Sequence, residues 1–216
     1  TLATSAMESV IGTSGSDDAL RLLGAGNTAI SAIETVLGGA ATDTVTMLAS
    51  GTIAASSVDS VVGAGGTDVV NLLGGGTSRF TQVESVIGSA GTDTAMIVGG
   101  GSLGTSNVET VVGSGETDVL SLLGAGTTRV SAVDTVLGSA ATDTIAILGG
   151  GSVSVSQVES VVGGAGTDTV TMLAAGSLTT SAVESVVGTA STDVLSFAGA
   201  GGASVTAIET VLGSTG

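Results

Sequence analysis

The chain repeats its residue pattern every 25 residues, over about eight and a half copies. A period of 20 to 50 residues is typical of stacked architectures, in which a single unit cannot bury its own apolar face. The period therefore predicts one solenoid domain over residues 1–216, expected to be a segment of a longer repeat array. An acidic residue marks each copy, at Glu8, Glu34, Asp59, Glu84, Glu109, Asp134, Glu159, Glu184 and Glu209.

Repeat positions are numbered here from this acidic residue as position 1. Position 3 is always Val, positions 5 and 18 are Gly, and position 10 is Asp in the eight complete copies. Each copy holds three short runs rich in Val, Ile, Thr and Leu and bounded by Gly, which is the pattern of β-strands. We predict an all-β fold, a right-handed parallel β-helix (β-solenoid) with about 8.5 coils of 25 residues and three short strands per coil.

Two further patterns concern how these coils pack. At positions 20 and 22, large and small residues exchange places between copies, as in Ile53 with Ala55 and then Ser78 with Phe80. Close packing of inward sites explains such an exchange, and it makes the unit nearer 50 residues over the first six coils. The valines at position 3 allow two orientations, an outward apolar stripe suited to lateral packing or burial at a bend.

The composition excludes several functions. The chain has no His, Cys, Pro, Trp or Tyr, and its three cationic residues are all Arg. A metal site of thiolates or imidazoles is therefore impossible. The net charge of −16 repels phosphate backbones, so we expect no nucleic-acid partner. No apolar run reaches the ~18 residues of a spanning helix, so we expect no membrane insertion.

Most carboxylates fall into two regular sets. Seventeen of the nineteen lie at positions 1 and 10, and the exceptions are Asp17 and Glu116. If equivalent residues stacked in neighbouring coils, like charges would lie ~4.8 Å apart and each pair would cost ~1 kcal/mol in water. Position 1 is expected to form a solvated charged face, with surface cation binding as the alternative.

Position 10 has two interpretations. Its Asp follows a Gly-rich turn, so the carboxylate can accept backbone N–H bonds of that turn. Alternatively, Asp oxygens and turn carbonyls bind calcium between successive turns. The calcium interpretation makes ligands of Asp18, Asp43, Asp68, Asp93, Asp118, Asp143, Asp168 and Asp193.

The stretch Gly163–Thr171, GGAGTDTVT, resembles the calcium-binding nonapeptide of RTX proteins, G-G-x-G-x-D-x-U-x. The resemblance implies that Asp168 is a calcium ligand, that residues 163–166 offer turn carbonyls and that Val170 is an inward anchor. The spacing departs from that family, since RTX nonapeptides run in tandem and this chain has a single nonapeptide in each repeat. The chain also resembles repeat segments of bacterial secreted or surface-layer proteins, which implies type I secretion and an extracellular or cell-surface location.

No single copy departs from the pattern as an active site would, so we expect no enzymatic activity. The favoured function is a structural extracellular segment of a surface layer, adhesin or filament, stiffened by calcium and self-associating end to end or laterally. Ice binding is an alternative, because several copies carry Thr-Asp-Thr, as at residues 42–44. A further alternative is an accessory solenoid of a secreted polysaccharide-active enzyme.

Overall fold

The computed structural model describes residues 1–4, 7–13, 15, 17–199 and 201–214, and in these residues it contains strands and no helix. The chain divides into two compact units, Thr1–Val108 and Glu109–Gly216. The strands of the first unit are β1 Leu2–Thr4, β2 Ser9–Ile11, β3 Ala19–Leu22, β4 Gly26–Ser31, β5 Thr35–Leu37, β6 Asp43–Met47, β7 Gly51–Ser56, β8 Ser60–Val62, β9 Asp68–Leu72, β10 Gly76–Thr81, β11 Ser85–Ile87, β12 Asp93–Ile97 and β13 Gly101–Ser106.

The second unit has the same kind of strands and connections. Its strands are β14 Thr110–Val112, β15 Asp118–Leu122, β16 Gly126–Ser131, β17 Thr135–Leu137, β18 Asp143–Ile147, β19 Gly151–Ser156, β20 Ser160–Val162, β21 Asp168–Met172, β22 Ser177–Ser181, β23 Ser185–Val187, β24 Val194–Phe197, β25 Ser204–Thr206 and β26 Thr210–Leu212. In both units each sequence repeat contributes three strands, as the sequence predicts.

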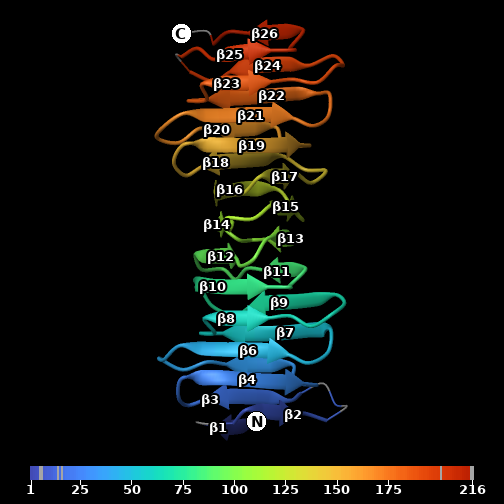
Figure 1. The fold of residues 1–216 in the computed structure, drawn as a ribbon, viewed down its shortest axis with the longest axis vertical. Coiled ribbons are helices and arrows are strands. Elements are labelled where there is room, and N and C mark those ends of the chain that lie inside the picture. Colours follow the sequence, from blue (N-terminus) through green and yellow to red (C-terminus); the bar gives the residue numbers. More distant parts are fainter. Residues whose placement is uncertain (5–6, 14, 16, 200, 215–216) are drawn as a thin grey trace. The chain divides into compact units, whose positions relative to one another are not determined.

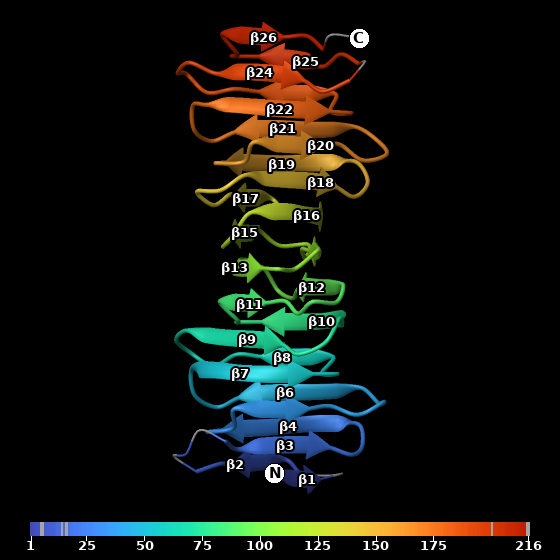
Figure 2. The same ribbon diagram turned by 180° about the vertical axis from the view of Figure 1, so that it is seen from behind.

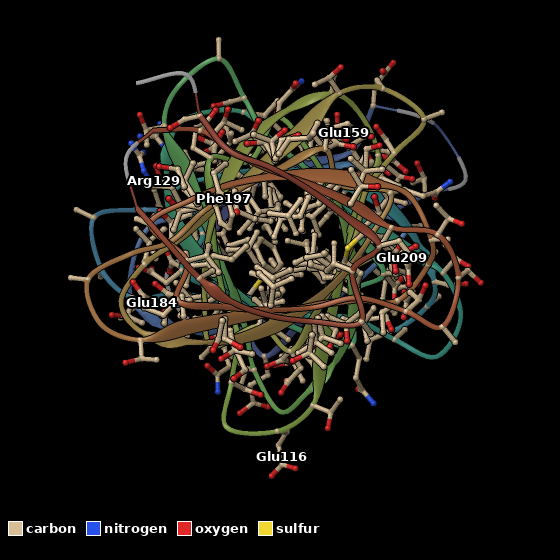
Figure 3. All side chains as sticks on the ribbon, turned by 90° about the horizontal axis from the view of Figure 1, so that it is seen from above. Glu116, Arg129, Glu159, Glu184, Phe197 and Glu209 are labelled. Atoms are coloured by element: carbon tan, nitrogen blue, oxygen red, sulfur yellow. The ribbon has the colours of Figure 1, made fainter. Side chains whose placement is uncertain are left out.

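Within each unit, successive strands alternate between two sheets. One sheet holds the odd-numbered strands and the other the even-numbered strands, and neighbours in a sheet pair in parallel (Figure 1 and Figure 2). Apolar side chains fill the space between the two sheets (Figure 3). The predicted fold class, an all-β parallel β-solenoid, is therefore confirmed.

The predicted coil, in which one repeat makes one turn of three strands, is wrong. Gly51 pairs with Asp68 and Gly151 with Asp168, so the chain returns to the same sheet after 17 residues. Each rung has two strands, and one repeat makes one and a half rungs. The physical reason is that every corner carries the chain from one sheet to the other, so a rung closes after two strands instead of three.

The two-sheet rung explains the exchange at positions 20 and 22. In the first unit, β7 (Ile53 with Ala55) belongs to the odd-numbered sheet and β10 (Ser78 with Phe80) to the even-numbered sheet. These four side chains are buried. Because two repeats make three rungs, an equivalent strand returns to the same sheet only every second repeat. The 50-residue period therefore reflects which of the two sheets a strand belongs to.

The valines at position 3 face the core, except Val211, which is 47 % exposed. Val36, Val86 and Val136 have no exposed surface, and Val61 is 1 % exposed. Of the two orientations that the sequence allows, burial is the one observed. An outward valine stripe for lateral packing is therefore absent from these copies.

Three kinds of corner join the strands. The wide corner covers positions 5–9, as in residues 63–67, the leucine corner positions 15–17, as in 73–75, and the tight corner positions 24, 25 and 1, as in 82–84. In the tight corner, position 24 adopts left-handed backbone with φ between 50° and 55°, which reverses the chain over a very short segment. The residues concerned are Ala32, Ser57, Gln82, Asn107, Ala132, Gln157, Ala182 and Ala207.

Candidate functional site

The acid at position 1 binds the backbone of the neighbouring rung. The N–H of Asp68 donates to Oε2 of Glu84 at 2.7 Å, and the N–H of Glu84 donates to the Asp68 carbonyl oxygen at 3.1 Å. This carboxylate therefore satisfies a corner N–H group, besides forming the charged surface that the sequence predicts. The same Asp N–H bond measures 2.8 Å in the pairs Asp18–Glu34, Asp43–Asp59, Asp118–Asp134, Asp143–Glu159, Asp168–Glu184 and Asp193–Glu209.

The aspartate at position 10 accepts hydrogen bonds from its own wide corner. Oδ2 of Asp68 accepts the N–H of Ala64 at 2.6 Å, and Oδ1 accepts the N–H of Gly51 at 3.0 Å. The Asp68 side chain has no exposed surface. This arrangement agrees with the hydrogen-bonded turn interpretation. The corresponding N–H donors to Oδ2 at position 6 are Thr13, Gly39, Ala64, Ser89, Ser114, Ser139, Gly164 and Thr189.

The structure does not stack the eight aspartates on neighbouring rungs. Asp43 begins β6 and Asp93 begins β12 in the even-numbered sheet of the first unit, whereas Asp68 begins β9 in the odd-numbered sheet. Asp43 and Asp93 are thus three rungs apart, about 14 Å. The close like-charge ladder expected from the sequence is wrong, because an equivalent residue returns to the same sheet only every third rung.

The described aspartates of position 10 are not gathered into a cluster of carboxylates. In the part of the chain that the structure describes, no group of three or more Asp or Glu side chains could hold a metal ion. Oδ1 of Asp43 and of Asp143 is buried without a hydrogen bond, but Oδ2 of each accepts N–H bonds. Calcium binding at position 10 stays a prediction, which thermal unfolding in calcium, in magnesium and in chelator tests.

Hydrogen bonds shift the pKa of two of these carboxyls. Burial raises the pKa of Asp193, but N–H and hydroxyl donors from Thr189 and the N–H of Gly176 more than offset it, so the pKa is lowered. The N–H and hydroxyl of Thr13 lower the pKa of Asp18. Both donor sets favour the ionised carboxylate.

We expect stability to fall in acid. A folded pKa below the unfolded value of about 3.9 means that the unfolded chain binds more protons, so the contribution of Asp18 and Asp193 is complete above about pH 4. It is lost as the pH falls through the lower folded pKa. Thermal unfolding at pH 6 and pH 3 checks this, and Asp193→Asn should weaken the dependence. A higher midpoint at pH 3 would show instead that relief of charge repulsion dominates.

Asp68→Ala should destabilise the first unit by about 1–3 kcal/mol for each N–H that loses its acceptor. Two N–H groups are affected, those of Ala64 and Gly51. Urea unfolding measures the change. Glu116→Ala is the matched control, since it removes one exposed carboxylate and should change stability by less than about 0.5 kcal/mol. Equal effects of the two substitutions would contradict the buried acceptor role.

Sequence reasoning missed the pairing of position 1 with position 10. The sequence does contain a signal for it, because each position-1 acid follows the preceding position-10 Asp by 16 residues. Residues paired between neighbouring rungs, such as Gly51 and Asp68, are 17 residues apart in the sequence, so the two separations differ by one. It also missed that Leu at position 15 is exposed, at 54 % in Leu48 and Leu73 and 56 % in Leu123. In the sequence these leucines follow directly on a strand with inward-facing apolar residues. In the structure they lie at a corner, outside the strand.

The chain has no match among protein-family models, among curated proteins or among solved structures. Within the described residues there is no helix of the length and apolar character needed to cross a membrane.

Proposed function

We propose that the chain is a structural repeat segment of an extracellular or cell-surface protein and has no catalytic role. One observation carries this proposal: the carboxylates at positions 1 and 10, which are the main reactive groups of the chain, accept backbone N–H bonds at the corners in repeat after repeat. Carboxylates placed for acid–base catalysis would differ in environment from one another. Here seven pairs share the same corner bond, in which the N–H of the position-10 Asp donates to the position-1 carboxylate, although Oδ1 of Asp43 and of Asp143 has no hydrogen bond.

The proposed role does not require an ion. Seven of the position-10 carboxylates have no exposed surface, and Oδ2 of each accepts the N–H of position 6, whereas Oδ1 of Asp43 and of Asp143 has no hydrogen bond. Within each unit the stacked rungs form a regular core, because each rung packs on the next. The absence of cysteine is compatible with stability outside the cell that does not depend on disulfides.

Force spectroscopy on the chain held between two handles tests the structural role. We expect stepwise unravelling of rungs under load and recovery of the folded length on relaxation. Smooth extension at low force, as for a disordered chain, would contradict the proposal. Antibody labelling of intact source cells tests the location, and labelling only after lysis would exclude the cell surface.

Ice binding is a second candidate because one face of the second unit carries rows of hydroxyls. On the odd-numbered sheet, neighbouring strands pair Ser152 with Thr169, Thr169 with Ser185, and Ser185 with Ser204. Within such a row, the hydroxyls of neighbouring strands are spaced about 4.8 Å apart. Outward residues of the same strand are spaced about 6.8 Å apart. An uncharged row of regularly spaced hydroxyls is suited to ordering water.

Thermal hysteresis measures this activity. We expect the chain to depress the freezing point below the melting point, and Thr169→Lys to abolish the effect because it places a long cation within the row. Thr52→Lys makes the same change on the first unit and should retain the effect. The absence of hysteresis in the unaltered chain would exclude ice binding.

A further inference from the structure

Hollows recur at the tight corners, and each contains the acid of position 1. We call these hollows the corner grooves, and in the first unit they lie at Glu8, Glu34, Asp59 and Glu84. The tight corner is shorter than the wide corner and lies recessed beside it. The groove at Glu84 is walled by residues 64–66 of a wide corner and residues 98–100 of a leucine corner.

The lining of a corner groove combines an acid with an apolar rim. In the groove at Glu84 the carboxylate is exposed, and Val98 on the rim is 40 % exposed. Gly65, Gly66 and Gly99 leave the walls without bulky side chains. A lysine or arginine has matching chemistry, because its aliphatic stem can lie on the rim while its charged end reaches the carboxylate.

A groove of the second unit has an additional carboxylate. It contains Asp134 at its tight corner, Glu116 on the wide corner and Leu148, 44 % exposed, on the rim. Figure 3 shows Glu116 projecting away from the sheets. Glu116 is one of the two acids outside the regular positions, and the corner hydrogen bonds described above do not use its carboxylate.

The spacing of the grooves selects the form of the ligand. Thr35 and Ser85, which directly follow Glu34 and Glu84, lie three rungs apart in the odd-numbered sheet. The register carries Thr35 to Ile87, so Ser85 is also displaced by two residues along the strand, and the separation is about 16 Å. An extended polypeptide advances about 13–14 Å in four residues, and its side chains at i and i+4 point to the same side. Two basic residues with this spacing reach both grooves, because their long flexible side chains cover the remaining distance of about 2–3 Å.

We propose that the corner grooves of the first unit bind a basic segment of an extended polypeptide, with one Lys or Arg at i in the Glu34 groove and another at i+4 in the Glu84 groove. Charge complementarity supports this occupant, since the chain has a net charge of −16 and its three Arg residues lie within strands. The inference rests on the grooves and is independent of the proposed structural role.

Fluorescent peptides with Lys at i and i+4, and isomers of equal charge with Lys at i and i+3, test this proposal at low salt. We expect the i+4 peptide to bind about tenfold more tightly, because binding in one groove raises the effective concentration at the second. Equal affinities, or no binding of either peptide, would overturn the proposal. The structural role would be unaffected.

Variants locate the site on the chain. Glu84→Gln keeps an oxygen that can accept the Asp68 N–H but removes the charge, so we expect it to weaken i+4 binding by about tenfold and thereby to abolish the preference for that peptide. Asp168→Asn removes the same charge from a carboxylate with no exposed surface and should leave the preference intact. A preference that survives Glu84→Gln would place the site elsewhere and overturn the assignment.

Discussion

Gly63→Ala should destabilise the first unit by about 3 kcal/mol or more, at the upper end of the range for overpacked sites. A Cβ atom at Gly63 would lie 1.9 Å from the carbonyl oxygen of Gln82 and 2.7 Å from Oδ2 of Asp68. The first contact is with backbone of a tight corner, which cannot rotate away as a flexible side chain could. We expect the midpoint of thermal unfolding to fall by roughly 6–12 °C.

A second glycine of the same wide corner provides the control. Gly65→Ala introduces the same methyl group where no atom lies within 4 Å, so we expect stability to change by less than about 0.5 kcal/mol. Similar losses in both variants would show that the close approach of Gly63 to Gln82 does not limit stability. The contact recurs in every complete repeat, with a Cβ to position-24 oxygen distance of 1.7–2.0 Å.

Deleting one repeat should damage the core more than deleting two. Removal of residues 59–83 joins position 25 to position 1 but moves every later strand to the opposite sheet. Leu103 and Thr105 would then present a large–small order on the side where Thr28 and Ile30 present small–large. Each mispacked strand costs about 1–3 kcal/mol.

Removal of residues 34–83 takes out three whole rungs and keeps each remaining strand in its own sheet. Stability in stacked repeats is close to a sum of neighbour terms, so this variant should unfold near the midpoint of the full chain. We expect the shorter deletion to unfold more than about 10 °C lower, as followed by circular dichroism. Equal unfolding midpoints of the two deletion variants would show that the large–small alternation at positions 20 and 22 does not depend on the sheet to which a strand belongs.

The inward residues were predictable to different degrees. Strand-forming runs and their glycine boundaries indicate where each strand lies, and the alternation of Ile53/Ala55 with Ser78/Phe80 already contains the three-rung period. The rung length was not predictable from these features, because it depends on how far each corner turns the chain. Six of the eight position-24 residues that make the sharpest corner are Ala or Gln, which carry no strong turn signal.

The candidate site shows the same limit. The sequence marks Asp68 and Glu84 as members of regular acidic positions, but it places equivalent acids on neighbouring coils. In the folded chain Glu84 lies beside Asp68 instead, where it accepts the Asp68 N–H. If whole repeats stacked directly, each acid would lie beside the equivalent acid of the next repeat. Because strands stack at the shorter rung spacing, the same sequence places different residues side by side.

The sequence by itself determined the β-class, the three strands of each repeat and the stacking of parallel strands, because strand propensity, alternation and glycine boundaries are local properties. Only the tertiary structure decided that two strands make a rung, that most valines at position 3 are buried and that the acids bind corner N–H groups. These features depend on contacts between residues of successive rungs, far apart along the chain, which no local pattern specifies.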